Sequence, residues 1–174
     1  MKRWIAGVLA VVSGVFLVGC WPREGGGDSP CPCPGGGGTT AILVPWETIE
    51  QGTHSGIKEE RGVVIREAQA WRNFWEEHVA GRYPKPELPF VDFVREMVIG
   101  YFLGERPTGG YVVEVEEIWV MEGKVSVRVG VRSPPPGDPV IQVLTQPCHL
   151  VRLGRFDLPV DFIVLEAESL LQGK

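Results

Sequence analysis

The chain has 174 residues, 44% of them hydrophobic, and its 22 acidic and 17 basic side chains give a formal net charge of -5. This composition is typical of a globular protein and excludes collagen-like and fully disordered chains, and the length is sufficient for one domain with tails. Nucleic-acid binding is not expected, because the sequence shows no cluster of basic residues that would bind phosphates.

The first twenty residues have the features of an export signal. Two basic residues precede an uncharged apolar run over residues 4–19. This run is short for a spanning helix, which needs about 20 residues, but is typical of a secretory signal peptide. It ends at Gly19-Cys20, which resembles a bacterial lipobox, in which the cysteine thiol is acylated. We therefore expect a lipoprotein signal peptide over residues 1–19 and lipidation (palmitate) of Cys20.

The alternative for this segment is an uncleaved membrane anchor with an incidental cysteine. In both cases the chain is expected in the cell envelope, anchored in the membrane and facing the extracytoplasmic side. Residues 20–40 follow as a flexible tether, because a segment so rich in Gly and Pro cannot bury enough apolar surface to offset its ordering entropy. Residues 41–174 are then the globular domain.

Three cysteines remain once Cys20 is lipidated: Cys31, Cys33 and Cys148. Export favours disulfides, so a bridge from the tether to Cys148 and unpaired thiols both stay open. The Cys-x-Cys pair in the tether offers only two ligands for a soft metal, which is an incomplete site. No metal and no cofactor are expected.

The body is predicted to consist mainly of short strands with one helix. In Arg66–Val79, the positions i, i+3, i+4 and i+7 are occupied by Trp71, Phe74, Trp75 and His78, which makes one apolar helical stripe. A stripe at helical spacing is expected to be core, with a binding face as the alternative. The expected strands and extended segments are residues 41–44, 62–65, 90–92, 97–103, 111–121, 125–131, 140–144, 150–153 and 160–165.

The clearest local pattern is a long antiparallel hairpin over residues 111–131. Apolar residues alternate along both halves, and the parity changes near Glu116-Glu117, which predicts a β-bulge. The second half, residues 125–131, has the pattern of a half-buried strand. The fold class predicted is α+β: a mainly antiparallel sheet, forming a sandwich or partial barrel, with one amphipathic helix packed on it.

The sequence lacks the usual catalytic signatures, and its three histidines have no metal-ligand spacing. Cys148-His149 is the one pair that suggests a thiol nucleophile with a base. Neighbours on an extended strand point to opposite faces, so a buried structural thiol is the expected reading.

Six segments stand together in the order and approximate spacing of the PrcB-like family, which the chain resembles over most of residues 52–153. The family is named for a lipoprotein subunit of a surface protease complex. The segments are residues 54–57, 91–93, 96–99, 104–111, 134–138 and 143–147.

The resemblance implies a lipid-anchored, non-catalytic accessory subunit that stabilises a subtilisin-like protease complex, and so a protein that is not an enzyme. Among the shared residues, Gly109 and Gly110 are expected to supply positive φ at a turn. Arg106, Thr108 and Tyr111 are candidates for an exposed rim that binds the partner, since Arg and Tyr are favoured as interface anchors. A purely structural role for these three residues is the alternative.

Three other functions stay open. A protease inhibitor would insert the rigid loop Ser133–Pro139 into an active site. A cell-envelope glycan-binding lipoprotein would use Trp46 or Trp119 as a stacking platform. A small enzyme would be built around Cys148.

Overall fold

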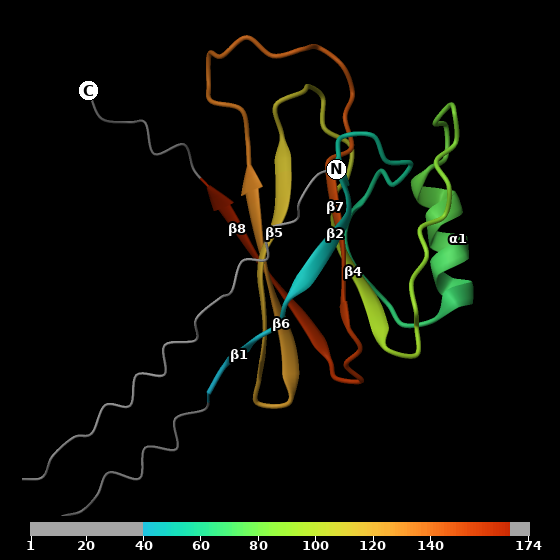
Figure 1. The fold of residues 1–174 in the computed structure, drawn as a ribbon. Helices are drawn as coiled ribbons and strands as arrows, with labels where there is room; N and C mark the ends of the chain where they lie inside the picture. Colours follow the sequence, from blue (N-terminus) through green and yellow to red (C-terminus); the bar gives the residue numbers. More distant parts are fainter. Residues whose placement is uncertain (1–39, 168–174) are drawn as a thin grey trace, which may run out of the picture. The chain divides into compact units, whose positions relative to one another are not determined.

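The computed structural model describes residues 40–167, in which two four-stranded sheets pack face to face and one helix covers the outer face of the second sheet (Figure 1). The predictions for the signal peptide, for lipidation of Cys20 and for Cys31 and Cys33 lie outside the described residues, as does all of the tether but its last residue. Within residues 40–167, no helix has the length and apolarity needed to cross a membrane.

Each of the two sheets combines strands that are far apart in the chain. In spatial order, the first sheet contains β1 (Ile42–Leu43), β5 (Val112–Met121), β6 (Lys124–Arg132) and β8 (Val160–Ala167). The second contains β2 (Trp46–Gly52), β7 (Cys148–Gly154), β4 (Glu96–Leu103) and β3 (Glu60–Ile65). All neighbours are antiparallel except β6 and β8, which run parallel. The predicted α+β sandwich is confirmed, with one mixed sheet.

The β5–β6 hairpin has the predicted bulge, because its register shifts between Val115 and Glu117. The hairpin turns through Glu122 and Gly123, whose φ values of 53° and 75° are both left-handed, as a two-residue turn between twisted strands requires. The prediction that β6 is half-buried was wrong. Ser126 and Gly130 on its outer side are also buried, and the bulge brings the Glu116 side chain over Gly130.

Three other segments differ from the expectation. Residues 90–92 form no strand, and residues 140–144 form a loop with largely exposed side chains despite their apolar composition. Strand β2 was not predicted. Most of its side chains are polar, and a bulge between Thr48 and Glu50 breaks its alternation.

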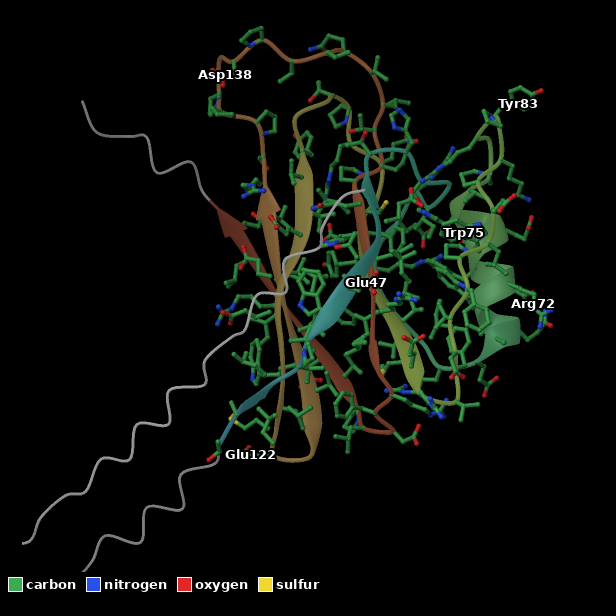
Figure 2. The ribbon with its side chains drawn as sticks, viewed as in Figure 1. Glu47, Arg72, Trp75, Tyr83, Glu122 and Asp138 are labelled. Carbon is green, nitrogen blue, oxygen red and sulfur yellow. The ribbon has the colours of Figure 1, made fainter. Side chains whose placement is uncertain are left out.

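Helix α1 (Ala68–His78) buries its predicted stripe against the second sheet, which confirms the core interpretation. In Figure 2, Trp75 lies on the side of the helix that faces the sheet and Arg72 points away from it. Alternate residues of β4 serve two cores: Met97 and Ile99 face the sandwich interior, whereas Val98 and Phe102 face the helix. Burial on both faces explains why β4 is almost continuously apolar.

His149 connects the two sheets at the part of β5 that extends beyond its short neighbour β1. Its ring is 2% exposed, and its Nδ1 accepts a hydrogen bond from the Val115 backbone N–H over 2.8 Å. Nε2 therefore carries the proton of the neutral ring and donates to Thr48 Oγ1, 3.0 Å away. A second cross-sheet bond joins the Gln51 side chain to the Val113 carbonyl at 3.1 Å. Side chains of one sheet thus satisfy backbone groups of the other.

Acid is expected to destabilise the fold through His149. Burial lowers the pKa of His149 below 6.5, against the opposing charge of Glu114. Below pH 6.5 the unfolded chain binds a proton that the folded chain does not, so the free energy of unfolding falls with falling pH, by at most about 1.4 kcal/mol per pH unit. Denaturant unfolding at pH 7.5 to 5.5 measures this slope. His149→Gln is expected to flatten it and the exposed His54→Asn to leave it unchanged; equal slopes in all three proteins would contradict the assignment.

Candidate functional site

Four of the six segments that carry the family resemblance, residues 54–57, 104–111, 134–138 and 143–147, lie at one end of the sandwich, the upper end in Figure 1. Residues 91–93 and 96–99 precede and begin β4 and lie at the other end of that strand. We call the loops 53–57, 104–111 and 133–147 together the motif end. The main chains of Arg106 and Thr145 exchange two hydrogen bonds of 2.7 and 3.0 Å, and Gln146 N–H donates to the Thr53 carbonyl at 2.8 Å. Because loops carry function when a rigid scaffold holds them, this end is the first candidate for a binding surface.

The three predicted partner-binding residues all lie at the motif end, where each is also tied to the fold. Arg106, with 31% of its side chain exposed, forms an ion pair with Glu60 at 2.9 Å, and its guanidinium lies 5.9 Å from the centre of the Tyr111 ring. Tyr111 is half-buried against the sandwich core, and the Thr108 carbonyl accepts a hydrogen bond from Thr145 Oγ1 at 2.8 Å. Their role in binding a partner stays a prediction.

The glycines of this turn differ from each other. Gly110 has a φ of 90°, the left-handed value expected of it, whereas Gly109 is not among the residues with positive φ. Gly109 instead donates its N–H to the Ile141 carbonyl at 2.9 Å, which joins the loop 104–111 to the loop 133–147.

The motif end exposes three large apolar side chains that sequence reasoning assigned to a strand. Ile141 is 74% exposed, Val143 52% and Leu144 57%. Grouped exposed apolar side chains mark interaction surfaces more often than scattered ones do. The apolar run over residues 140–144 is visible in the sequence, where it predicts a strand. Its exposure could not be predicted, because it depends on the loop being held away from both sheets.

A buried polar cluster lies beside the motif end, where helix α1 finishes. His78 is fully buried; its Nδ1 lies 2.9 Å from Ser55 Oγ and its Nε2 3.2 Å from Glu50 Oε2. Arg82 reaches the same place, with one guanidinium nitrogen 2.5 Å from Glu50 Oε1 and the other 3.3 Å from His78 Nε2. The cluster joins β2, α1 and the loop after the helix.

The backbone explains why these groups meet. Gly56 N–H donates to the His78 carbonyl at 2.8 Å, and a Cβ on Gly56 would overlap the Glu77 carbonyl oxygen. Only glycine allows the loop to approach the helix end this closely. Ser55 Oγ also accepts the Ile57 N–H at 3.1 Å, so this hydroxyl holds both the turn and the histidine.

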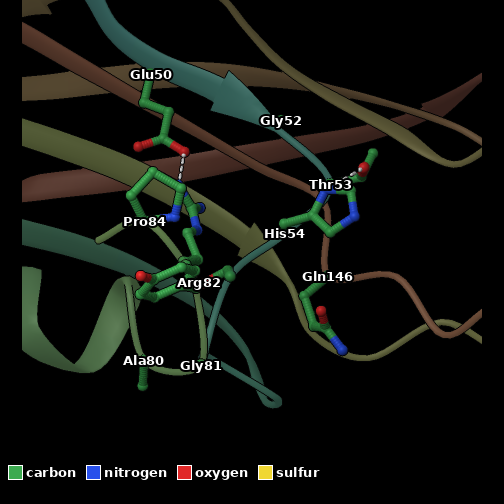
Figure 3. A pocket seen from close by; sticks show the side chains of 11 residues that line it. Glu50, Gly52, Thr53, His54, Ala80, Gly81, Arg82, Pro84 and Gln146 are labelled. Atoms are coloured by element: carbon green, nitrogen blue, oxygen red, sulfur yellow. Dashed lines mark hydrogen bonds and ion pairs between the residues drawn. The ribbon is translucent and has the colours of Figure 1, made fainter. Parts of the chain in front are cut away.

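The charges in the cluster favour an ionised Glu50. Burial alone would raise the pKa of Glu50, but hydrogen bonds from His78 and Arg82, together with the charges of both groups, outweigh burial and lower it. Arg82 and Glu50 also line a cavity of about 550 Å³ whose wall includes His54 and Gln146 of the motif end (Figure 3). The cluster therefore borders this cavity through Glu50 and Arg82, whereas His78 is fully buried behind them.

Cys148 and His149 do not form a dyad. Cys148 packs in the core beneath the helix, whereas His149 lies on the opposite face of β7. Burial, followed by the charge of Glu50, raises the pKa of the Cys148 thiol to about 12, so it is not a thiolate nucleophile at neutral pH. Cys148 is a buried free thiol in the structure, and its bridge to Cys31 or Cys33 stays a prediction.

The two tryptophans considered for glycan stacking are both engaged by other side chains. Trp46 meets the His149 ring edge-on at 5.7 Å between ring centres, and the guanidinium of Arg128 lies 5.5 Å from the Trp119 ring centre. Both rings are also partly buried, which leaves less of each surface available for stacking on a sugar.

Comparison with known proteins gives one match. Residues 97–154, from β4 to the end of β7, match a family model described as PrcB C-terminal. Neither the curated proteins nor the solved structures contain a significant match to the chain. The matched segment includes Arg106, Thr108 and Tyr111 and the exposed loop 133–147, and so covers most of the motif end.

Proposed function

We propose that this chain, a member of the PrcB-like family through its residues 97–154, is a membrane-anchored, non-catalytic accessory subunit of an extracytoplasmic protease complex. One observation carries the proposal: four of the six segments of the family resemblance lie together at one end of the sandwich, where the loop 133–147 exposes Ile141, Val143 and Leu144. An enzyme would use such loops to place reactive groups, whereas these loops present apolar side chains on a hydrogen-bonded frame.

The anchor and the location rest on the N-terminal sequence. A lipidated Cys20 followed by a tether would hold the domain near the membrane, in the cell envelope, and leave the motif end free to contact a partner. A subtilisin-like protease is the partner that the family resemblance suggests.

Capture of the partner from native membranes tests the proposal. The full-length chain with a C-terminal tag is crosslinked and purified beside Ile141→Asp/Leu144→Asp, in which two apolar contacts become charged. Truncating a hot-spot side chain typically reduces affinity by about 2 kcal/mol, so we expect at least a tenfold loss of the co-purified protease. Phe90→Asp/Val94→Asp is the matched control, because both side chains are 84% exposed and lie outside the motif end.

Two outcomes would overturn the proposal. Recovery of the wild-type chain without a stoichiometric protease would remove the accessory role. An equal loss of co-purified protease with the control pair would show that binding does not depend specifically on the motif end. Cys20→Ser tests the anchor separately, because it is expected to release the chain from the membrane without changing the motif end.

Inhibition of a protease is a second candidate, favoured by the loop Ser133–Pro139. The loop projects beyond both sheets, with Asp138 exposed near its tip (Figure 2). It is stiffened by four prolines and by a turn in which Asp138 N–H donates to the Pro135 carbonyl at 3.2 Å. Preorganised loops of this kind bind active sites well. Inhibition of a panel of serine proteases that disappears when residues 134–138 are replaced by Gly and Ser would favour it over scaffolding.

A further inference from the structure

We propose that Glu50, His78 and Cys148 form a binding site for a divalent cation that accepts sulfur and nitrogen ligands, such as Zn²⁺. In this structure the Arg82 guanidinium occupies the position of the cation. The carboxylate oxygen, ring nitrogen and sulfur of these three residues all lie within 4.8 Å of one another. This inference is independent of the proposed protease partner.

The donor set fits such a cation. One thiolate, one imidazole and one carboxylate are all ordinary zinc ligands, with bond lengths of roughly 2.0 to 2.3 Å, which place tetrahedral ligand atoms roughly 3.3 to 3.7 Å apart. Glu50 Oε2 and His78 Nε2 already lie 3.2 Å apart, so only Cys148 Sγ has to come closer to the other two atoms, by about 1 Å, a movement within reach of side-chain torsions. Three protein ligands leave the fourth position open, and Glu50 lines the cavity of about 550 Å³ through which an ion and a water molecule can enter.

The orientation of His78 supports the assignment. In this structure Nε2 donates to Glu50 Oε2 at 3.2 Å. When an ion binds, the ring proton moves to Nδ1, where Ser55 Oγ, 2.9 Å away, can accept it, so that the lone pair of Nε2 is free for the ion. Metal-binding histidines typically donate their second nitrogen in this way, which fixes the tautomer and the ring orientation. His78 also stands on the last turn of a helix that is buried against the sheet, so the ligand is held by a rigid element.

Arg82 shows that the site already attracts positive charge. Its guanidinium donates to Glu50 at 2.5 Å and approaches Nε2 of His78 at 3.3 Å, so a cation contacts two of the three ligands. Arg82 lies four residues beyond His78 and lines the cavity, so its side chain can turn into that space when a metal ion enters. Binding then breaks the Cys148 S–H bond, forms a metal–sulfur bond and releases the proton to solvent, which gives one proton per ion.

Cobalt(II) titration tests the site, because a cobalt–thiolate bond produces a charge-transfer absorption band that other ligands do not. The protein is the full chain with Cys20, Cys31 and Cys33 replaced by Ser, which leaves Cys148 as its single thiol. We expect one Co²⁺ per chain, a thiolate band that Zn²⁺ abolishes, and release of one proton. Arg82→Gln, which removes the competing cation, is expected to tighten binding about tenfold, whereas Cys148→Ser abolishes the band and weakens binding about 10- to 100-fold.

Glu47→Gln is the matched control for Glu50→Gln. Glu47 is on the same strand, but its carboxylate is on the surface and pairs with Arg152 at 2.6 Å. Glu50→Gln is expected to weaken binding about tenfold, and Glu47→Gln to leave it unchanged. If Cys148→Ser does not fold, the band and the Arg82→Gln gain still decide the question. Absence of a saturable thiolate band in both the parent and Arg82→Gln overturns the proposal, as does binding that Cys148→Ser leaves intact.

Discussion

Replacing Trp71 by Ala is expected to lower the free energy of unfolding by about 3–5 kcal/mol, the range found when a buried Trp or Phe is truncated. The indole is 2% exposed and packs against the rings of Phe74 and Trp75, with ring centres 6.0 and 5.3 Å away. Its Nε1 donates to the Pro89 carbonyl at 3.0 Å, so the substitution leaves a cavity and also an unpaired carbonyl. Denaturant unfolding followed by circular dichroism measures the change.

Arg72→Ala is the control for this substitution. Arg72 is the next residue of the same helix and is exposed, so its removal is expected to change the free energy of unfolding by less than about 0.5 kcal/mol. Similar effects of the two substitutions would contradict the assignment of the Trp71 face to the core. The helix position would then contribute through helix propensity alone.

The features that could be predicted from the sequence are those that depend only on the local periodicity of apolar residues. Trp71, Phe74, Trp75 and His78 share one helical face wherever the helix packs, so their burial follows from spacing. The bulge in β5 follows in the same way, because one extra residue changes the parity of an alternating strand.

The features that could not be predicted depend on which strands become neighbours. Strand β8 runs parallel to β6 because the chain crosses to the second sheet as β7 before it returns, and no local pattern records that crossing. The loop 140–144 has the composition of a strand, but hydrogen bonds from Gly109 and between Arg106 and Thr145 hold it outside both sheets. Apolar composition alone does not distinguish a buried strand from an exposed loop.

The proposed cation site of Glu50, His78 and Cys148 could not be predicted for the same reason. The three residues come from β2, the end of α1 and the start of β7, and up to 98 positions separate them, so no motif spacing links them. Sequence reasoning treated Cys148 together with its neighbour His149, which the strand directs to the opposite face. The polar residues at positions 50, 51, 54 and 55 were the one hint of a polar site near the helix, but their spacing matches no known ligand motif.

Gly104→Ala is expected to lower the free energy of unfolding by about 2–5 kcal/mol, through two separate effects. Gly104 has a φ of 72°, a left-handed conformation that costs a residue with a Cβ about 1–2 kcal/mol. Its Cβ would also lie 2.7 Å from the Lys58 carbonyl oxygen and 2.9 Å from the Glu60 nitrogen. Both are backbone atoms of the adjacent chain, so they cannot turn aside, and overpacking of this kind costs about 1–3 kcal/mol more.

Gly123→Ala separates the two effects, because Gly123 has a nearly identical φ of 75° but no atom within 4 Å of the added Cβ. It is expected to lower the free energy of unfolding by about 1–2 kcal/mol only. Denaturant unfolding of both variants gives the contribution of the close approach as their difference, and equal effects would refute it.

Gly104 is the first residue of the segment that carries Arg106 and Tyr111. The Lys58 carbonyl that its Cβ would displace also accepts the Glu105 N–H at 3.0 Å. Under the proposed function, Gly104→Ala should therefore also weaken partner capture, and Gly123→Ala, at the opposite end of the β5–β6 hairpin, should not.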